Sequence, residues 1–465
     1  MTLEHLSPLD AMFLDLEDGV SHMHIASVLI LDGPPPPYEE FAAMVEGKLA
    51  QVPRYRQVVR TVPLQLGRPV WIDDPHFNLA YHVRHTALPA PGGEEALARL
   101  VGRVMSQQLD RSKPLWELWM VEGLSGDRWA LLGKTHHSIV DGVSGTELLT
   151  VLLDAAVDAP HPPPEPWSPA PAPTALALAV DAVTTMARSS AEQLRAVRAA
   201  TRVPRQAAAE LREVVSGLAA LAGIVPLPPQ SSLNGPIGPH RRYAWATTTV
   251  DDIKRIRKSL GGTFNDVILT AITAGFRTLL ERRGETTDRV VRTLVPVSVR
   301  GRDASGRAVG DGTYDNKVSA MFAELPVGVA DPVERLKVVQ DQLTGLKESK
   351  QAVAGEALTS LSGFAPPILL ALGTRIATKA AQRNVNTITT NVPGPQLPLY
   401  VLGRRVRTAL PYVPLGVQCR IAVAIFSYDG QVNFGVTGDY DTAPDIDVLC
   451  VGIEHGMTEL LHRAV

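Results

Sequence analysis

The chain has 465 residues and a mass of 50.0 kDa, which is more than a single hydrophobic core usually supports, so two domains around a shared cleft are expected. The apolar fraction of 45% and the charged fraction of 20% indicate an ordinary globular protein and exclude extensive disorder. A net charge of −3 gives no overall basic field, so a nucleic-acid partner is not expected.

The two cysteines and the N-terminal residues indicate the cellular compartment of the protein. Cys419 and Cys450 have no C-x-x-C spacing, so neither a disulfide framework nor a thiolate zinc site is indicated. The N-terminal residues are too polar for a signal peptide, and no apolar stretch is long enough to span a bilayer. We expect a cytoplasmic protein that is soluble or peripheral to a membrane.

The first part of the chain, residues 1–158, alternates short strand-like and helix-like segments. Residues 25–31 and 129–135 are rich in β-branched and aliphatic side chains and are predicted strands. These features predict an N-terminal lobe of mixed α/β structure.

A connecting region is predicted for residues 159–242. It begins with a proline-rich stretch, residues 160–173, which favours neither helix nor sheet. Residues 174–221 are helical in composition, are broken at Pro204 and contain more arginines than acidic residues. We favour a solvated helix face over a weak amphipathic contact with an anionic membrane, because interfacial aromatic side chains are lacking.

Residues 243–465 again mix helices and strands and are predicted to form a C-terminal lobe. The expected helices are residues 250–260, 264–280, a segment capped by Asp331 and beginning at Pro332, and 446–463. The expected strands are residues 290–299, 384–390, 421–428 and 431–437, the last two joined by an Asp429-Gly430 turn. The fold class is therefore α/β (α+β) with two sandwich-like lobes.

The run from 136 to 142, His-His-Ser-Ile-Val-Asp-Gly, lies between the predicted strand 129–135 and a helix opened by a Ser144/Glu147 capping box. A strand-to-helix connection presents side chains to a cleft. A histidine there can have a pKa near neutrality and take a proton from a hydroxyl group. We expect Asp141 to pair with an arginine, for which Arg300 is the candidate, and so to fix the loop ending in Gly142.

Residues 133–146 also partly resemble a metal site, a phosphate loop and a nucleophile elbow. A metal site is disfavoured, because the two adjacent imidazoles diverge and no third ligand is spaced nearby. Neither a phosphate loop nor a serine nucleophile elbow is complete, because the glycine that each pattern requires is missing. A structural role for one histidine remains open, and we favour it for His136.

The run His-His-x-x-x-Asp-Gly resembles the active-site signature of the bacterial wax ester synthase/diacylglycerol acyltransferase family, within the CoA-dependent acyltransferase superfamily. Further segments agree with this resemblance in order along the chain. They are the opening at residues 6–14 with Glu17 and Met23-His24, the run 109–116 ending in Pro114-Leu115-Trp116, Asn265-Asp266, residues 296–300 ending in Arg300, and Asn391-Val392-Pro393-Gly394-Pro395, preceded by Thr390 where serine is more usual.

The resemblance implies a two-lobed, chloramphenicol acetyltransferase-like fold with the active site in a tunnel between the lobes. It implies that His137 is the general base and that Asp141 is mainly structural. The implied donor is a fatty acyl-CoA, and the implied acceptor is diacylglycerol or a long-chain alcohol. The acyl-CoA is a substrate, so neither a cofactor nor a metal is expected. Contact with the inner membrane surface or with lipid droplets fits such substrates.

Three further motifs are candidates for binding or catalysis. Thr263 and Asp266 predict a capping box that places Asn265 in the first turn of a helix, where its amide and free backbone N–H groups suit an oxyanion. The alternative is that Asn265 only satisfies local backbone groups. Trp116 either lines an acyl channel or is a core aromatic. The rigid turn predicted at residues 391–395 either shapes the interface or merely ends a strand.

Two rival functions remain at this point. Carrier-dependent peptide condensation or polyketide esterification shares the His-x-x-x-Asp-Gly element. A non-catalytic protein that coats lipid droplets is the rival from another class. The sequence ranks neither diacylglycerol against alcohols nor one acyl chain length against another.

Overall fold

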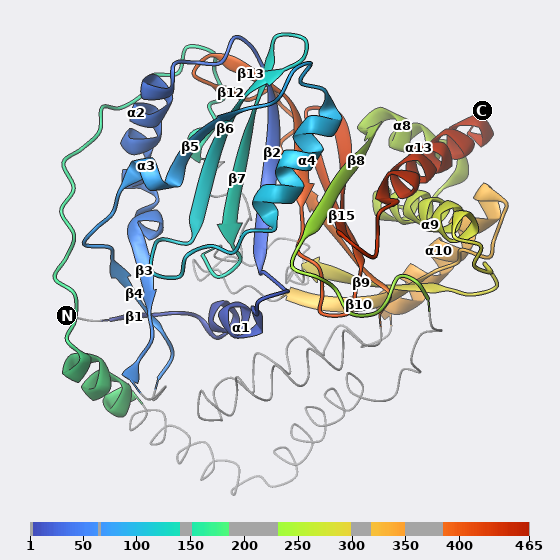
Figure 1. Cartoon of the computed structure of the whole chain (residues 1–465). Helices are drawn as coiled ribbons and strands as arrows, with labels where there is room; N and C mark the ends of the chain where they lie inside the picture. Colours follow the sequence, from blue (N-terminus) through green and yellow to red (C-terminus); the bar gives the residue numbers. More distant parts are fainter. Residues whose placement is uncertain are drawn as a thin grey trace, which may run out of the picture.

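The chain was analysed as a computed structural model, which describes residues 3–63, 67–139, 151–185, 231–298, 318–348 and 385–464. In these ranges the strands form two six-stranded sheets and a small three-stranded sheet (Figure 1). Helices lie against both large sheets. The mixed α/β architecture expected from the sequence is confirmed.

One large sheet lies in the N-terminal lobe, and its strands pair antiparallel except for the outer pair β5 and β6. In spatial order they are β12 (Tyr400–Val401), β13 (Arg404–Tyr412), β2 (His24–Asp32), β7 (Arg128–His136), β6 (Trp116–Leu124) and β5 (Val83–Ala87). The small sheet beside it is β1 (Glu4–His5), β4 (Val70–Asp73) and β3 (Gln57–Arg60). The helices of this lobe are α1 (Pro8–Leu16), α2 (Tyr38–Lys48), α3 (Leu79–His82) and α4 (Glu94–Met105), with 3₁₀ turns η1 (Leu49–Gln51) and η2 (Pro53–Arg56).

Alternating side chains of β2 explain why this sheet is covered on both faces. Val28 and Ile30 pack with the apolar residues of α4, whereas Leu29 and Leu31 pack with Phe41 and other residues of α2. Successive strand residues point to opposite faces, so an uninterrupted apolar run requires cover on both sides.

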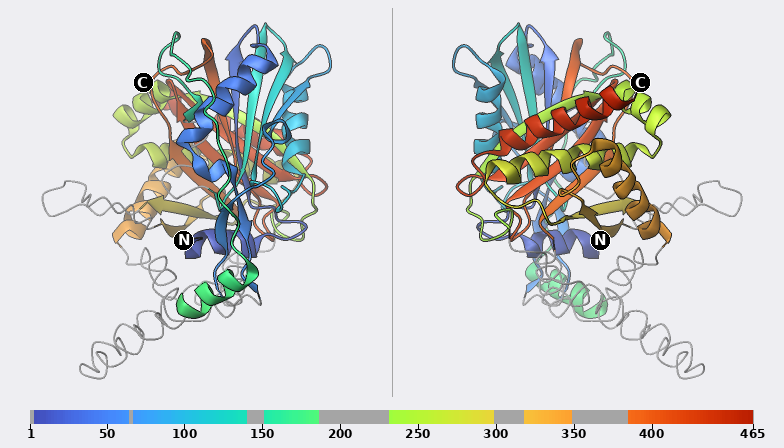
Figure 2. Two further views of the ribbon diagram at one scale, coloured as in Figure 1. Left: turned by 90° about the vertical axis from the view of Figure 1, so that its left-hand side faces the viewer. Right: turned by 90° about the vertical axis from the view of Figure 1, so that its right-hand side faces the viewer.

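The other large sheet belongs to the C-terminal lobe. In spatial order its strands are β10 (Val318–Leu325), β9 (Val291–Ser298), β11 (Thr387–Pro393), β14 (Ile421–Tyr428), β15 (Gln431–Asp439) and β8 (Arg241–Thr249). Its helices are α8 (Val250–Leu260), α9 (Phe264–Arg282), α10 (Pro332–Glu348) and α13 (Ile446–Arg463), and α9 and α13 lie side by side (Figures 1 and 2). Their close approach requires glycine, since a Cβ on Gly275 would lie 2.8 Å from the carbonyl oxygen of Leu449.

The two lobes are interlocked by strands that cross between them. Strands β12 and β13 come from the C-terminal half of the sequence, yet β13 pairs with β2 of the N-terminal sheet. Pro411 of β13 also approaches Gly435 of β15 so closely that a Cβ there would lie 1.7 Å from the Pro411 carbonyl oxygen. The division into sequential lobes at residues 158 and 243 did not anticipate this crossing.

Most local predictions agree with the structure. The helices predicted at 250–260 and 446–463 coincide with α8 and α13, and the predicted hairpin is β14 and β15. Asp429 and Gly430 both have positive φ, at 45° and 82°, as a type I′ turn requires. The proline-rich stretch forms neither helix nor strand. No helix in the described ranges is both long and apolar enough to cross a bilayer.

Candidate active site

The candidate catalytic turn begins where β7 ends. Its first bend is closed by the Ile139 N–H, which donates to the His136 carbonyl at 3.0 Å. The backbone N–H of His137 donates to the carbonyl of Met23 at 2.8 Å, which ties the turn to the neighbouring strand. Asp141, Gly142 and most of the helix predicted after them lie outside the described residues, as does Arg300, so the predicted Asp141–Arg300 pair stays a prediction.

The imidazole of His137 is held by a ring contact with the N-terminal segment. It stacks on Phe13 of α1 with a centroid distance of 3.8 Å and an interplanar angle of 21°. The residue is half-buried. Burial lowers the pKa of His137 to about 4, which is below the near-neutral value expected from the sequence. At neutral pH the ring is therefore unprotonated and able to accept a proton.

His136 faces into the protein. Its side chain is 1% exposed, and its Nδ1 accepts a hydrogen bond from the Ser138 backbone N–H at 3.0 Å. The Ser138 Oγ lies 2.7 Å from the same nitrogen. Burial lowers the pKa of His136 as well. Its contacts are those of a residue that shapes the turn.

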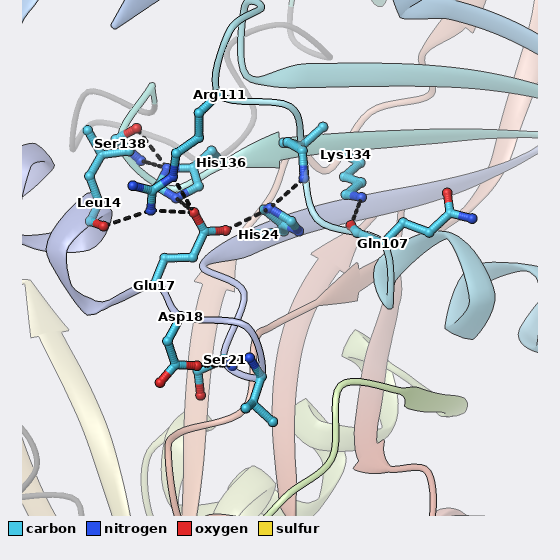
Figure 3. A network of polar contacts seen from close by, with 12 residues as sticks. Leu14, Glu17, Asp18, Ser21, His24, Gln107, Arg111, Lys134, His136 and Ser138 are labelled. Atoms are coloured by element: carbon cyan, nitrogen blue, oxygen red, sulfur yellow. Dashed lines mark hydrogen bonds and ion pairs between the residues drawn. The ribbon is translucent and has the colours of Figure 1, made fainter. Parts of the chain in front are cut away.

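A buried carboxylate, Glu17, lies beside these histidines (Figure 3). Its side chain is 1% exposed and accepts two hydrogen bonds from Arg111, at 2.8 and 2.5 Å. His24 Nε2 lies 3.2 Å from one carboxylate oxygen, and His136 Nε2 lies 3.6 Å from the other. The β2–β7 register places His24 directly opposite His136, so both rings reach the same acid.

Glu17 and Met23 are part of the family resemblance, but nothing in the sequence places Phe13 or Glu17 next to the histidines. These contacts join residues far apart in the chain, so periodicity does not reveal them. The signal in the sequence that could have pointed to this contact is Glu17 itself. A glutamate directly after an apolar helix is seldom buried unless it is paired.

Asn265 lies in the first turn of α9, as predicted. The Thr263–Asp266 capping box is confirmed, since Asp266 Oδ2 accepts from the Thr263 N–H at 2.6 Å and Thr263 Oγ1 accepts from the Asp266 N–H at 3.3 Å. The Asn391 amide donates to Asn265 Oδ1 at 3.3 Å. Two motifs that are distant in sequence therefore meet, and the contact engages the carbonyl side of the Asn265 amide while leaving its N–H₂ group free of this partner.

The residues around Pro114 form the other side of the turn. The Leu115 carbonyl accepts from the His136 backbone N–H at 2.9 Å. Trp116 is fully buried, and its indole N–H donates to the Tyr55 carbonyl at 2.8 Å. Trp116 thus has the contacts of a core aromatic, the second of the two alternatives for this residue.

The segment containing Thr390 and Asn391 differs from the prediction. Strand β11 runs to Pro393, so the strand does not end before the motif; residues up to Pro393 pair in parallel with β14. Proline is tolerated because it stands at the strand end, where its missing N–H removes no interior bond. Gly394 follows where a Cβ would lie 2.2 Å from the Ser427 carbonyl oxygen, so close strand contact explains this glycine.

The buried histidines make stability sensitive to acid. Burial lowers the pKa to about 3 for His24 and to about 4 for His82 and His137. The unfolded chain binds these protons near pH 6.5. Between that pH and 4 the unfolded state holds more protons, so the free energy of unfolding falls as pH falls, by up to about 1.4 kcal/mol per pH unit for each histidine. Urea titrations at pH 7, 6 and 5 measure this loss, and an unchanged value contradicts it.

Two models of known protein families match the chain. Residues 6–268 match the model described as "Wax ester synthase/diacylglycerol acyltransferase catalytic domain", and residues 314–461 match "WS/DGAT C-terminal domain". The chain belongs to the wax ester synthase/diacylglycerol acyltransferase family. It is an acyltransferase enzyme, and the resemblance drawn from the motifs is confirmed.

Individual relatives of the wax ester synthase/diacylglycerol acyltransferase family match over nearly the whole chain. A protein of Mycobacterium tuberculosis (strain ATCC 25618 / H37Rv) named "Probable diacyglycerol O-acyltransferase tgs1" is 36% identical, over 99% of this chain and 96% of its own. The solved wax ester synthase/diacylglycerol acyltransferase from Marinobacter aquaeolei VT8 is 25% identical with a TM-score of 0.69, covering 99% of both chains.

Peptide-synthetase condensation domains share the fold of this family. The starter condensation domain of rhizomide synthetase RzmA has a TM-score of 0.56 at 14% identity and covers 100% of this chain and 94% of its own. This likeness concerns the architecture alone. It confirms that the two-lobed α/β fold implied by the motifs is present.

Proposed function

We propose that this enzyme transfers a long-chain fatty acyl group from acyl-CoA to the hydroxyl group of diacylglycerol, of a fatty alcohol, or of both. Family membership supports this proposal, as does the relative named for diacylglycerol O-acylation at 36% identity. The observation that most directly supports the proposed chemistry is the neutral, half-buried ring of His137. It follows the end of β7 and stacks on Phe13.

His137 acts in this proposal as the general base. It takes the proton from the acceptor hydroxyl while the oxygen attacks the thioester carbonyl carbon. The tetrahedral oxyanion then collapses, the carbon–sulfur bond breaks, and the imidazolium gives its proton to the leaving CoA thiolate. No covalent enzyme intermediate is required. At a pKa of about 4 the ring is unprotonated before the acceptor arrives, as a base must be, while the same low pKa reduces its affinity for the proton.

Asn265 is the proposed oxyanion donor. Its carbonyl oxygen accepts from Asn391, so its N–H₂ group remains for another acceptor, and the first turn of α9 adds the positive end of a helix. Asn265→Ala is expected to lower kcat about 10²–10³-fold, as is typical for the loss of one such donor. Steady-state kinetics measure this effect, with thermal unfolding as the control for folding. A folded variant with wild-type kcat contradicts the role.

The experiment that tests the function uses the purified chain with palmitoyl-CoA and either hexadecanol or diacylglycerol. Thiol release is followed together with the ester product, and a reaction without acceptor measures hydrolysis. Acceptor-dependent ester formation supports the proposal. Lipid binding without turnover for every donor–acceptor pair supports a droplet-coating protein in its place.

Carrier-dependent transfer is the second candidate, and the fold shared with condensation domains is the observation that favours it. That condensation domain is described in complex with C8-CoA, so use of free acyl-CoA alone does not separate the two functions. Ester formation with diacylglycerol or hexadecanol as the acceptor separates them.

Peripheral contact with a membrane or lipid droplet accompanies the proposed lipid substrates. The helical residues 175–185 support it, because Leu176, Val180 and Val183 recur at helical spacing and are 73%, 53% and 51% exposed. The remainder of the region suspected from sequence, up to residue 221, lies outside the described residues. Flotation with vesicles of anionic lipid tests the contact, and recovery of all protein in the lipid-free fraction contradicts it.

A further inference from the structure

Glu17 is a buried charge that the proposed chemistry does not use. It caps α1, since its backbone N–H donates to the Phe13 carbonyl at 3.2 Å. Burial raises the pKa of the Glu17 carboxyl, but its contacts with His136 and His24 lower it further, so the net pKa is well below the usual range. An unpaired carboxylate in this position would cost several kcal/mol of desolvation.

Arg111 supplies the compensating positive charge and also fixes the acid in place. Its guanidinium donates to Glu17 Oε2 through two nitrogens, at 2.8 and 2.5 Å, and to the Leu14 carbonyl at 2.7 Å. Arg111 is 46% exposed, whereas Glu17 is 1% exposed. The carboxylate thus lies just beyond the end of α1 and faces the imidazole of His136 (Figure 3).

The hydrogen bonds of His136 determine which of its ring nitrogens carries the proton. The Ser138 backbone N–H can only donate, so Nδ1, at 3.0 Å, must be the unprotonated acceptor. The proton of the neutral ring is therefore on Nε2, which points at Glu17 Oε2, 3.6 Å away. This distance is long for a hydrogen bond, but a buried negative charge still favours the tautomer whose N–H dipole points toward it.

That tautomer has a direct consequence for His137. The bond from Ser138 to His136 Nδ1 closes the turn in which His137 is the central residue. The same N-terminal segment that carries Glu17 also supplies the Phe13 ring and the Met23 carbonyl that contact His137. If Nδ1 carried the proton, it would donate to Ser138 Oγ, 2.7 Å away, and the Ser138 N–H would lose its acceptor, so one of the bonds that hold the turn would be lost.

We propose that Glu17 is a positioning residue for acyl transfer: by favouring the Nε2–H tautomer of His136, it holds the turn that presents His137. The inference rests on the proposed function of His137 as the base. Glu17 touches no reacting atom in this scheme. Its effect in this scheme reaches the chemistry through His136.

The test combines kinetics with the tautomer of His136. In protein labelled with ¹⁵N-histidine, the nitrogen shifts of His136, assigned by their loss in His136→Gln, report which nitrogen is protonated. Glu17→Gln is expected to introduce the Nδ1–H form and to lower kcat about 10- to 100-fold with little change in KM, the loss typical of a misplaced reacting group. Glu17→Asp keeps the charge and is expected to retain part of the Nε2–H form and part of the wild-type kcat.

Two control variants separate positioning from general destabilisation. Arg111→Gln removes the arginine partner of Glu17 but keeps the carboxylate and its contacts with His24 and His136, so the melting temperature is expected to fall while the tautomer stays. Asp445→Asn breaks a comparable carboxylate–arginine pair with Arg283 in the C-terminal lobe, and it is expected to leave kcat unchanged.

The outcomes are decisive even if one variant folds poorly. An unchanged tautomer in folded Glu17→Gln overturns the proposal, whatever happens to kcat. A changed tautomer with wild-type kcat also overturns it. If Glu17→Gln does not fold, Glu17→Asp is judged in its place: a lowered kcat with the Nε2–H form fully kept overturns the proposal, and so does the Nδ1–H form with wild-type kcat. If the wild-type chain forms no ester, the proposed function fails, and the tautomer still shows whether Glu17 controls the turn.

Discussion

Replacing His137 with alanine is expected to lower kcat for ester formation about 10²–10⁴-fold, the usual contribution of a general base. The imidazole that takes the acceptor proton is lost, and with it the ring that later protonates the CoA thiolate. Removing the half-buried ring leaves space beside Phe13, so a modest loss of stability is also expected. Thiol release and ester formation at saturating acyl-CoA measure the rate.

A histidine outside the site provides the matched control. His85 on β5 is 41% exposed and pairs with Glu122 at 2.8 Å, so His85→Ala is expected to keep wild-type kcat. Thermal unfolding of both variants shows whether the fold is intact. Undiminished turnover in folded His137→Ala rejects the assignment of the base, without bearing on the family to which the chain belongs.

Gly435→Ala is expected to lower the free energy of unfolding by about 3 kcal/mol or more, the upper end of what overpacking a dense interior costs. The new Cβ would lie 1.7 Å from the Pro411 carbonyl oxygen and 2.9 Å from the Tyr243 hydroxyl oxygen. Both Gly435 and Tyr243 lie in the C-terminal sheet, whereas Pro411 lies in a strand of the N-terminal sheet. The clash therefore falls where the lobes interlock, and neither backbone can move without disturbing its own sheet.

Urea denaturation measures this loss, and a second glycine gives the comparison. Gly345 lies inside α10, and a Cβ there would meet nothing within 4 Å, so Gly345→Ala is expected to be neutral or to stabilise by about 0.5–1 kcal/mol. Equal unfolding free energies for wild type and Gly435→Ala would show that the two sheets do not pack as closely as their backbones indicate.

Local elements followed from sequence because their causes are local. Thr263 with Asp266 began a helix, Asp429-Gly430 closed a hairpin, and the apolar spacing of residues 446–463 marked the final helix; all three are present. Each depends on side chains and backbone angles within a few positions. The end of β11 was misplaced because its pairing partner β14, which sustains the strand up to Pro393, is not adjacent in sequence.

The set of motifs also indicated the family and its acyl transfer chemistry. Several short runs in a specific order can be recognised in a sequence without knowledge of how the chain packs. The same runs did not show which of their residues meet. Asn391 contacts Asn265, and the Leu115 carbonyl accepts from the His136 backbone N–H, only because sheet order brings these segments together.

The sequence alone therefore indicated many of the elements, the fold class and the candidate histidine pair. The tertiary structure decided three further things: that β12 and β13 complete the N-terminal sheet, that Phe13 stacks on His137, and that Glu17 faces His136. The physical reason is the same in each case. Hydrogen-bond register and burial act between residues that the chain separates widely, whereas propensity, capping and turn chemistry act between neighbours.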